Sequence, residues 1–533
     1  MKPSRLCCST YHVIRQRFAK RHWRRPYKRE RQQSFVLQHL KNLLVLLMLS
    51  VHAGTVYSDA LDDRWHAIEF GDVTMYTDLD AEDAKALAEH VIHFRAILDK
   101  ALPKELEQLP DAPKLKLLVF ERRADFAKLM KPRHFAAFTQ PSLKETLLVI
   151  APSRTRSTLF KNTRHELVHY QLRNQSVGFP PWYDEGLAVM LEHVILEHKR
   201  EDKREDKREE EKEGIAGLVE VTSDLDALYG MYRGPVREIG VGSLSDLTET
   251  SDVTRWPARE LERFYGLSGQ FVHFLSSVHN EALERYLGQQ DRGLAAALEQ
   301  PLLGVEKEFT RYRRARNKDQ LVFSAEINDV ELSRRAMCES EVALVHARAA
   351  ENANTRRALK LYRSIVALKP ESADAFIDLA RGYVASGDYD GAASALDEAA
   401  KLLGSPNAQY LVLRSMLKLR ECGAVGLDGC RDVWQATSRM LRQALDIDPG
   451  ELEGIFLLGV VDLYRGRPGS ALNYLRAVHR YVPWAPRVNY HLGECLRILG
   501  DPAAVIYLRN ARAWSHDEQW TKLAEASLEL VDR

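Results

Sequence analysis

Two histidines and a neighbouring glutamate in the middle of the chain have the residue types and the spacing of a catalytic metal site. Residues 165–169 read His-Glu-Leu-Val-His, so His165 and His169 lie four positions apart. On a helix this spacing puts both imidazoles on one face, where they can bind a single ion. Zn²⁺ accepts nitrogen and oxygen ligands, and catalytic zinc sites use three protein ligands. The pattern therefore predicts a zinc site built on a helix.

The predicted third ligand is Glu185, which lies in the segment Trp-Tyr-Asp-Glu-Gly-Leu-Ala at residues 182–188. Glu166 follows the first histidine directly, so it projects beside the metal and can take a proton from a water molecule. The alternative is a helix that merely carries two histidines, because the five-residue pattern also occurs by chance. The glutamate in the downstream segment favours the metal site.

The site needs two helices joined by a short loop. Thr163 is a candidate N-cap for the helix that carries the histidines. Pro180 and Pro181 interrupt the chain just before the third ligand. Residues 182–197 then predict a second helix, because apolar residues recur at helical spacing at Leu187, Met190, Leu191 and Val194.

Upstream of these helices the pattern predicts a mixture of strands and helices. Alternating apolar residues indicate a strand or hairpin between residues 65 and 77, followed by a helix over 81–102. Residues 114–120 predict a strand, 124–130 a short helix and 146–151 another strand.

The segments HELVHY and PPWYDEGLAVMLEH resemble the gluzincin metallopeptidases, and more narrowly the bacterial peptidase-MA-like group. The resemblance implies an α+β zincin-like domain over about residues 62–320, with the upstream strands as a wall for an extended peptide substrate. It also implies His165, His169 and Glu185 as the ligands of one zinc ion and Glu166 as the general base.

Residues 256–320 are helical in pattern, and they contain Tyr265 in a Tyr-x-x-Ser-x-x-Phe-Val setting that is similar to a helix of the same peptidases. The resemblance implies that Tyr265 donates a hydrogen bond to the oxyanion formed during catalysis. The alternative is that Tyr265 only packs in the core. His273 on the same helix is expected to be a partly buried histidine without a catalytic role.

Composition limits the other classes of function. A chain of 533 residues with 45 % hydrophobic and 28 % charged residues is expected to form two or three soluble globular domains. Residues 1–42 hold twelve Lys or Arg residues and a single acidic one, Glu30. Because the whole chain has a net charge of +1, the remainder carries about −10. The remainder therefore gives no indication of nucleic-acid binding.

The basic N-terminal segment runs into an apolar stretch of leucines, valines and methionine at residues 43–51, followed by His-Ala-Gly. This order is typical of a secretory signal peptide, which we place over residues 1–54. The protein is then expected to be exported to the periplasm or the cell exterior. The alternative is an uncleaved membrane anchor formed by residues 43–57.

Residues 198–213 form a run of charged residues that contains no apolar side chain. Opposite charges recur every three to four positions, which predicts a solvent-exposed helical insertion. We interpret it as a tether, with a binding arm for a charged partner as the alternative.

Cys422 and Cys430 flank the glycine-containing loop CGAVGLDGC. In an oxidising compartment the two thiols can form a disulfide. The alternative is that both remain thiols.

From about residue 339 the chain repeats with a period near 34 residues, with small residues such as Ala380 and Gly459 at equivalent positions and prolines such as Pro370 and Pro449 at the ends of units. This pattern resembles the tetratricopeptide repeat, with about four to five units and an insertion around residues 420–432. We therefore predict an all-α solenoid over residues 335–533, whose concave face binds a protein partner.

Two functions fit these observations. One is an exported zinc-dependent metallopeptidase that hydrolyses peptide bonds and recruits proteins through its repeats. The other is a non-catalytic scaffold with a peptidase-like fold, in which the repeats alone act. Zinc content separates the two before any substrate is known.

Overall fold

The structure is a computed structural model. Within residues 61–531 it describes all but 103–113, 131–136, 142, 144, 175–178, 200–216, 235–242, 251–252, 254–255, 289–292, 328–329, 352, 426–429 and 514–517. The predicted signal or anchor segment and most of the charged run therefore lie outside the described residues. In the part that is described, no helix is both long and apolar enough to cross a bilayer.

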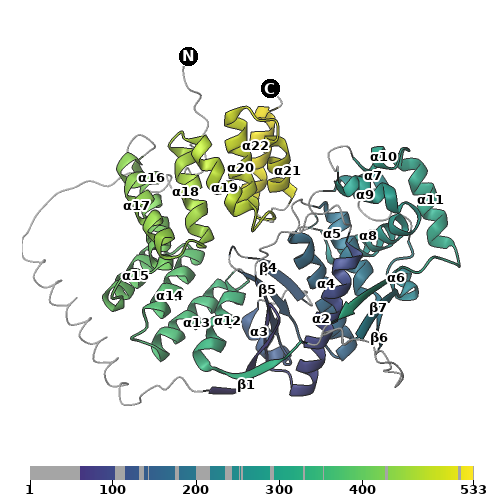
Figure 1. The fold of residues 1–533 in the computed structure, drawn as a ribbon, viewed down its shortest axis with the longest axis horizontal. Helices are drawn as coiled ribbons and strands as arrows, with labels where there is room; N and C mark the ends of the chain where they lie inside the picture. Colours follow the sequence, from purple (N-terminus) through teal and green to yellow (C-terminus); the bar gives the residue numbers. More distant parts are fainter. Residues whose placement is uncertain are drawn as a thin grey trace, which may run out of the picture.

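A six-stranded sheet stands at the centre of the N-terminal part, in the order β4-β5-β3-β2-β1-β9 (Figure 1). β2, β3 and β5 run parallel to one another, whereas β1, β4 and β9 pair antiparallel to their neighbours. The strands are β1 (Leu61–Phe70), β2 (Val73–Thr77), β3 (Lys114–Val119), β4 (Ala137–Pro141), β5 (Glu145–Ile150) and β9 (Ser333–Cys338).

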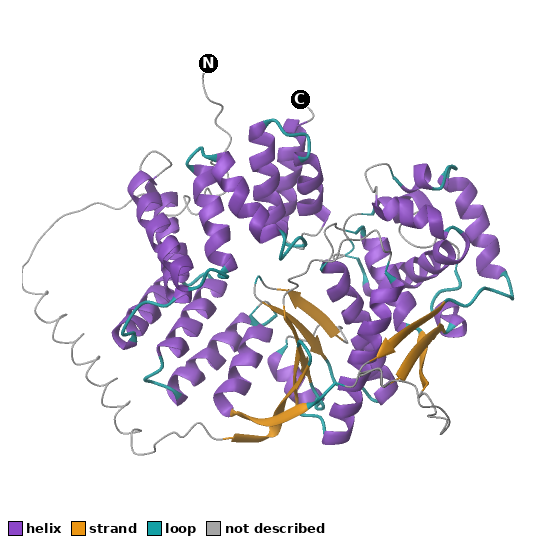
Figure 2. Ribbon diagram, in the orientation of Figure 1, coloured by secondary structure: helices purple, strands orange, loops and turns teal. Residues whose placement is uncertain are grey.

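Both faces of this sheet are buried, because successive side chains of a strand point to opposite faces. On β3, Leu115 and Leu117 belong to a core that includes α2 (Ala81–Ala101) and α4 (Arg156–Arg173), whereas Leu118 faces the other way. That second face packs against α12 (Glu339–Ala350) and α13 (Thr355–Leu368), the first helices of the C-terminal part. The result is three layers, helix, sheet and helix (Figure 2).

The hairpin, the long helix and the two central strands that the sequence predicted are confirmed as β1–β2, α2, β3 and β5, and the short helix is α3 (Arg123–Leu129). The helix with the histidines begins at Arg156, eight residues earlier than expected. Thr155 is its N-cap, and its side chain accepts a hydrogen bond from the Thr158 backbone N–H. Thr163 lies inside the helix, so its assignment as the cap was wrong; its hydroxyl donates to the Leu159 carbonyl.

The second predicted helix is shorter than expected. α5 spans Pro181–Glu192, and Val194–Lys199 forms strand β6 instead of continuing the helix to residue 197. β6 pairs antiparallel with β7 (Gly217–Ser223), which pairs in turn with β8 (Val322–Ile327). The start of the charged run is therefore a strand rather than a helix. The β-branched Val194 and Ile195 suit that strand.

Residues 256–320, predicted to be helical, contain a long helix, α8 (Ala258–Val278), and three shorter ones within the described part, and two further short helices precede them. These helices pack beside α5 and away from the large sheet (Figure 1). The shorter helices are α6 (Leu225–Gly230), α7 (Leu244–Glu249), α9 (Asn280–Gly288), α10 (Leu294–Ala297) and α11 (Leu302–Arg314).

The C-terminal part consists of successive antiparallel helices in an arc, which begins beside the sheet at α12 and ends above β4 in this view (Figure 1). Small residues let paired helices approach closely. At Gly459, for example, a Cβ atom would lie only 2.8 Å from Leu475 Cγ. After α12 and α13 come α14 (Ala373–Ser386), α15 (Tyr389–Leu402), α16 (Ala408–Val425), α17 (Arg431–Ile447), α18 (Leu452–Tyr464), α19 (Pro468–His479), α20 (Pro486–Leu499), α21 (Ala504–Ala513) and α22 (Glu518–Val531).

The two parts of the chain are continuous rather than joined by a linker. The expected boundary at residue 335 falls inside β9, which pairs with β1 at the edge of the sheet opposite β4. β8 and β9 also lie beyond residue 320, where the α+β domain was expected to end. β8 alternates between exposed and buried side chains over six residues, whereas β9 shows no clear alternation because it is largely exposed.

Cys430, at the start of α17, is disulfide-bonded. The expected partner, Cys422, lies in a segment of α16 whose side chains fall outside the described residues.

Candidate metal centre

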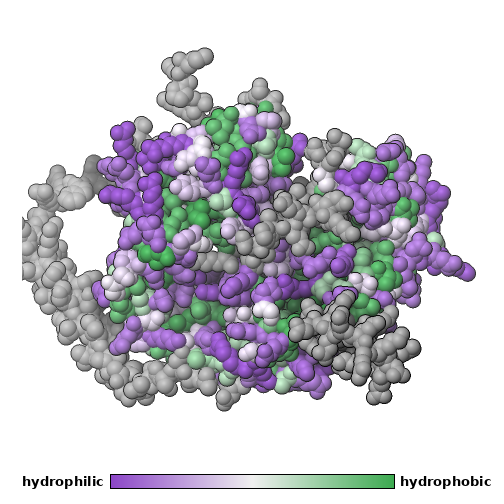
Figure 3. All heavy atoms as spheres, in the orientation of Figure 1, coloured by the Kyte–Doolittle hydropathy of each residue, from purple (hydrophilic) through white to green (hydrophobic). Residues whose placement is uncertain are grey.

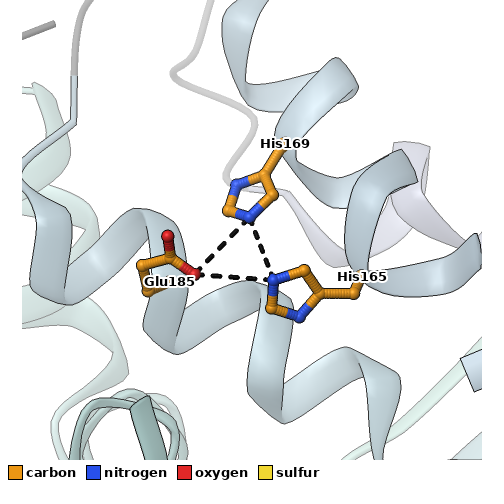
Figure 4. Close-up of side chains that lie close together, drawn as sticks. All are labelled: His165, His169 and Glu185. Atoms are coloured by element: carbon orange, nitrogen blue, oxygen red, sulfur yellow. Dashed lines mark hydrogen bonds and ion pairs between the residues drawn. The ribbon is translucent and has the colours of Figure 1, made fainter. Parts of the chain in front are cut away.

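His165 and His169 lie on α4 and Glu185 lies on α5, and the three side chains point toward one another (Figure 4). His165 Nε2 is 3.1 Å from His169 Nε2. Glu185 Oε2 is 3.5 Å from each of these nitrogens. Among the described residues, this is the group of histidine, cysteine and acidic side chains whose ligand atoms lie close enough to hold a metal ion.

The triangle has the size that zinc requires. Bond lengths of about 2.0–2.1 Å and tetrahedral angles separate ligand atoms by about 3.3–3.4 Å. The three observed separations lie on either side of this value. In addition, Glu185 Oε2 is buried and receives no hydrogen bond from any described residue. A buried carboxylate oxygen without a donor suits a metal ligand, because a cation satisfies it.

Two further carboxylates hold the histidines in place. His165 Nδ1 is 2.7 Å from Glu192 Oε2, and His169 Nδ1 is 2.8 Å from Asp184 Oδ1. Each carboxylate accepts the Nδ1–H proton, which leaves the Nε2 lone pair directed at the triangle. Carboxylate–histidine pairs of this kind fix the tautomer and the ring orientation of metal ligands.

The charges around the two imidazoles favour a cation. Burial alone would lower the pKa of His165, but the carboxylates of Glu185 and Glu192 raise it to about 9. Burial is likewise outweighed at His169, whose pKa Asp184 and Glu185 raise well above its ordinary value. The imidazoles in turn hold the pKa of Glu185 well below its usual range, although burial opposes this. Three acidic groups around two imidazoles leave negative charge for a dication to balance.

Glu166 is 6 % exposed and lies on α4 beside the first ligand. The Thr139 hydroxyl, from strand β4, donates a hydrogen bond of 2.6 Å to Glu166 Oε2. Glu166 is therefore held by a side chain from the edge of the sheet. Its other carboxylate oxygen keeps acceptor capacity for a water molecule.

Tyr265 lies on α8, and the structure brings it close to the third ligand. Burial and the adjacent Glu185 carboxylate raise the pKa of its phenol. Tyr265 therefore stays protonated near neutral pH and can donate a hydrogen bond. It also contacts the hydrophobic core, so the packing interpretation and the catalytic one both remain compatible with its position.

The close contact between α5 and α8 places Glu185. A Cβ atom at Gly186 would lie 2.7 Å from the Ser268 carbonyl oxygen and 2.7 Å from Val272 Cγ2. Only glycine allows α5 to approach α8 so closely. The Glu-Gly pair of the motif therefore supplies a ligand and the space that positions it.

Sequence reasoning missed Thr139, Asp184 and Glu192. Glu192 follows Glu185 by two helical turns on α5, and this spacing was the available signal. Nothing local marks Thr139, because its partner is 27 positions away. His273 is buried, and its pKa is lowered to about 4 by burial. Its Nδ1 lies 3.1 Å from the Tyr229 hydroxyl, in a part of the core outside the metal centre.

The protein-family models that match this chain concern its C-terminal part. Two tetratricopeptide-repeat family models match, one over residues 349–414 and the other over 456–516. No curated protein matches the chain.

Several solved structures are similar in part. YrrB, described as a TPR protein with an unusual peptide-binding site, is 18 % identical and covers 34 % of this chain and 90 % of its own, with a TM-score of 0.25. The pilF protein of Pseudomonas aeruginosa is 18 % identical and covers 36 % of this chain and 85 % of its own, with a TM-score of 0.29. A tetratricopeptide repeat protein from Parabacteroides merdae is 11 % identical and covers 50 % of this chain and 92 % of its own, with a TM-score of 0.28.

These TM-scores are low, so the assignment rests on the family models and on the paired helices. The predicted period near 34 residues is confirmed in the matched segments. The C-terminal part of the chain is a helical solenoid that contains tetratricopeptide repeats.

Proposed function

We propose that this protein is a zinc-dependent peptidase whose repeats bind a protein partner or substrate. The observation that carries the proposal is the triangle of His165 Nε2, His169 Nε2 and Glu185 Oε2, which has the dimensions of three zinc ligands. The resemblance of both motifs to gluzincin peptidases supports it. A zinc ion bound there would act as a Lewis acid toward a peptide carbonyl and make water nucleophilic near neutral pH.

Glu166 and Tyr265 lie beside the proposed ligands, and we infer a role in peptide hydrolysis for each. Glu166 accepts a proton from the attacking water and returns it to the leaving amine. Tyr265, kept protonated by its raised pKa, donates a hydrogen bond to the oxyanion. β4 is an edge strand, and no described strand pairs with its outer side. An extended peptide can therefore bind along β4 by main-chain hydrogen bonds.

The repeats supply a surface for protein binding. Tetratricopeptide repeats form extended concave surfaces, and the residues here offer exposed apolar groups such as Tyr464, Ile498 and Ile506. In Figure 3 apolar side chains gather in patches over the repeat helices among hydrophilic ones. A non-catalytic adaptor is the second candidate function, and the two repeat models favour it as much as they favour a peptidase with a recruiting domain.

Glu166→Gln tests catalysis. The amide keeps the shape of the side chain but cannot accept a proton from water, so turnover should fall by about 10²–10⁴. Zinc content and melting temperature should match the wild type, because Glu166 is not a proposed ligand. The measurement is hydrolysis of a fluorescence-quenched peptide library. Equal turnover of both proteins would assign the activity to another site, and a zinc-loaded but inactive wild type would favour the adaptor.

A further inference from the structure

A strand at the edge of the sheet joins the metal centre to the repeats. Adjacent residues of a strand point to opposite faces. On one face of β4 the Thr139 hydroxyl donates to Glu166. On the other face the Gln140 side-chain amide donates to the backbone carbonyl of Arg348, at 2.9 Å. Arg348 lies on α12, the first helix of the solenoid.

Arg348 makes a second contact with the same hairpin. Its guanidinium Nη1 is 3.0 Å from Glu145 Oε1, at the start of β5. Lys116 of β3 bonds the other oxygen of Glu145 at 2.5 Å. Because the guanidinium and the carboxylate are both largely shielded from water, this charge-assisted hydrogen bond is stronger than an exposed one.

The tip of the hairpin also packs with the repeat helices. Leu143, between β4 and β5, is 6 % exposed and forms part of the apolar cluster that contains Leu411 of α16 and Leu492 of α20. α12 and later repeat helices thus both hold the hairpin near its tip, because Gln140 and Glu145 lie next to the turn that contains Leu143. On the side of α4, Thr139 of the hairpin contacts the proposed general base.

We propose that the repeats are part of the catalytic apparatus, because α12 holds β4 through Gln140 and Arg348, and β4 orients Glu166 through Thr139. Thr139 is a positioning residue, and the Gln140–Arg348–Glu145 contact is the link through which the solenoid sets its position. A partner that shifts the first repeats then changes the turnover of the peptidase. This inference rests on the proposed hydrolytic function.

The first test changes Thr139. Thr139→Val removes the hydroxyl and nearly keeps the shape, and we expect kcat to fall about tenfold or more, because a misplaced group loses much of its effect. KM and zinc content should stay within about twofold, since no ligand or substrate contact changes. Thr139→Ser restores the hydroxyl and should recover most of kcat. A loss of kcat that Ser does not restore, or an unchanged kcat in Thr139→Val, would overturn the role of Thr139.

The second test changes the link. The double variant Gln140→Leu/Arg348→Met should lower kcat to about the level of Thr139→Val, and adding Thr139→Val to it should lower kcat no further. The matched control is Arg487→Met, which removes a half-buried ion pair between α20 and Glu453 of α18 that includes none of the linking residues. The control should leave kcat unchanged. If the fold-losses in kcat of the double variant and of Thr139→Val instead multiply in the triple variant, the link and Thr139 act independently.

A third measurement does not need activity. Hydrogen exchange of the backbone amides of β4 should become at least about tenfold faster in the double variant and stay unchanged in Arg487→Met. If the wild type cleaves no peptide of the fluorescence-quenched library, the proposed function fails on that probe, whereas this exchange measurement still decides whether the repeats hold β4. Equal exchange in all three proteins would overturn the coupling.

Discussion

At the scale of single residues, the metal centre depends as much on Asp184 and Glu192 as on the three ligands. Both carboxylates bind the Nδ1–H groups of the histidines, at 2.8 Å and 2.7 Å, and so direct the Nε2 lone pairs into the triangle. Glu192 is itself held by Lys161, whose Nζ is 3.3 Å from its carboxylate. The network resists rotation of the rings when no metal is bound.

Glu192→Gln should weaken zinc binding by about 10–100-fold, because the amide is a poorer acceptor and no longer fixes the imidazole. Competition with a chelator measures the affinity. Glu197→Gln, on the exposed side of β6, is the matched control and should bind zinc like the wild type. An unchanged affinity in Glu192→Gln would show that His165 is oriented by other contacts.

The ligands could be predicted from the sequence because helical periodicity fixes the relation of His165 to His169. The Glu185 motif added the third ligand at a fixed place on the next helix. Thr139 could not be predicted in this way, because its contact with Glu166 depends on where a strand packs against a helix. The same holds for the link to Arg348, whose partner in the hairpin lies 208 positions away.

At the scale of elements, the approach of α5 to α8 sets the position of the third ligand. The sequence predicted both helices, but the end of α5 was wrong because Val194 and Ile195 suit the strand β6 as well as a helix. The apolar periodicity of the two helices did not predict how closely α5 and α8 approach each other. This close approach became clear from the space around Gly186, which Ser268 and Val272 fill.

Gly186→Ala should destabilise the protein by about 1–3 kcal/mol and weaken zinc binding. In a helix interior alanine is more favourable than glycine by about 1 kcal/mol. A loss of stability in Gly186→Ala would therefore come from the steric clash with α8 and not from helix propensity. The Ser268 carbonyl belongs to the backbone of α8 and cannot rotate away, so α5 has to shift and move Glu185. Thermal unfolding and chelator competition measure the two effects.

The matched control for this change is Gly230→Ala. A Cβ atom at Gly230 meets nothing within 4 Å. It should therefore leave both stability and zinc binding unchanged. A stable Gly186→Ala variant with wild-type zinc affinity would contradict the positioning role of the α5–α8 contact.

At the scale of the whole molecule, the sheet and the repeats share a core. His346 of α12 packs between Trp65 of β1 and Phe120 after β3, with ring centroids 4.6 Å and 5.5 Å apart. The period of the repeats was predictable because each unit repeats its own packing. Their contact with the sheet was not, because α12 reads as an ordinary repeat helix. A fragment that begins at residue 335 lacks the sheet residues that share a core with its first helices, so we expect those helices to be less stable in the fragment.

The shared core should be sensitive to acid. Burial and the charge of Arg357 lower the pKa of His346 to about 4, below its ordinary value of 6.5. Between these two values the unfolded chain binds a proton that the folded protein does not, so stability falls as the pH falls. The expected loss from this group is about 2 kcal/mol between pH 7 and pH 5. His346→Leu should therefore show a smaller loss over this range in urea unfolding. An identical loss in both proteins would mean that other groups carry the acid sensitivity.

The central claim is that His165, His169 and Glu185 form one catalytic zinc site, and elemental analysis of zinc per chain tests it most directly. The wild type and Glu166→Gln should each hold about one zinc, because the three ligands are intact in both. His165→Ala and Glu185→Ala should hold little or none at the same chelator concentration, while circular dichroism shows that their helices remain. Full zinc occupancy in both ligand variants, or none in the wild type after exposure to zinc, would contradict the account.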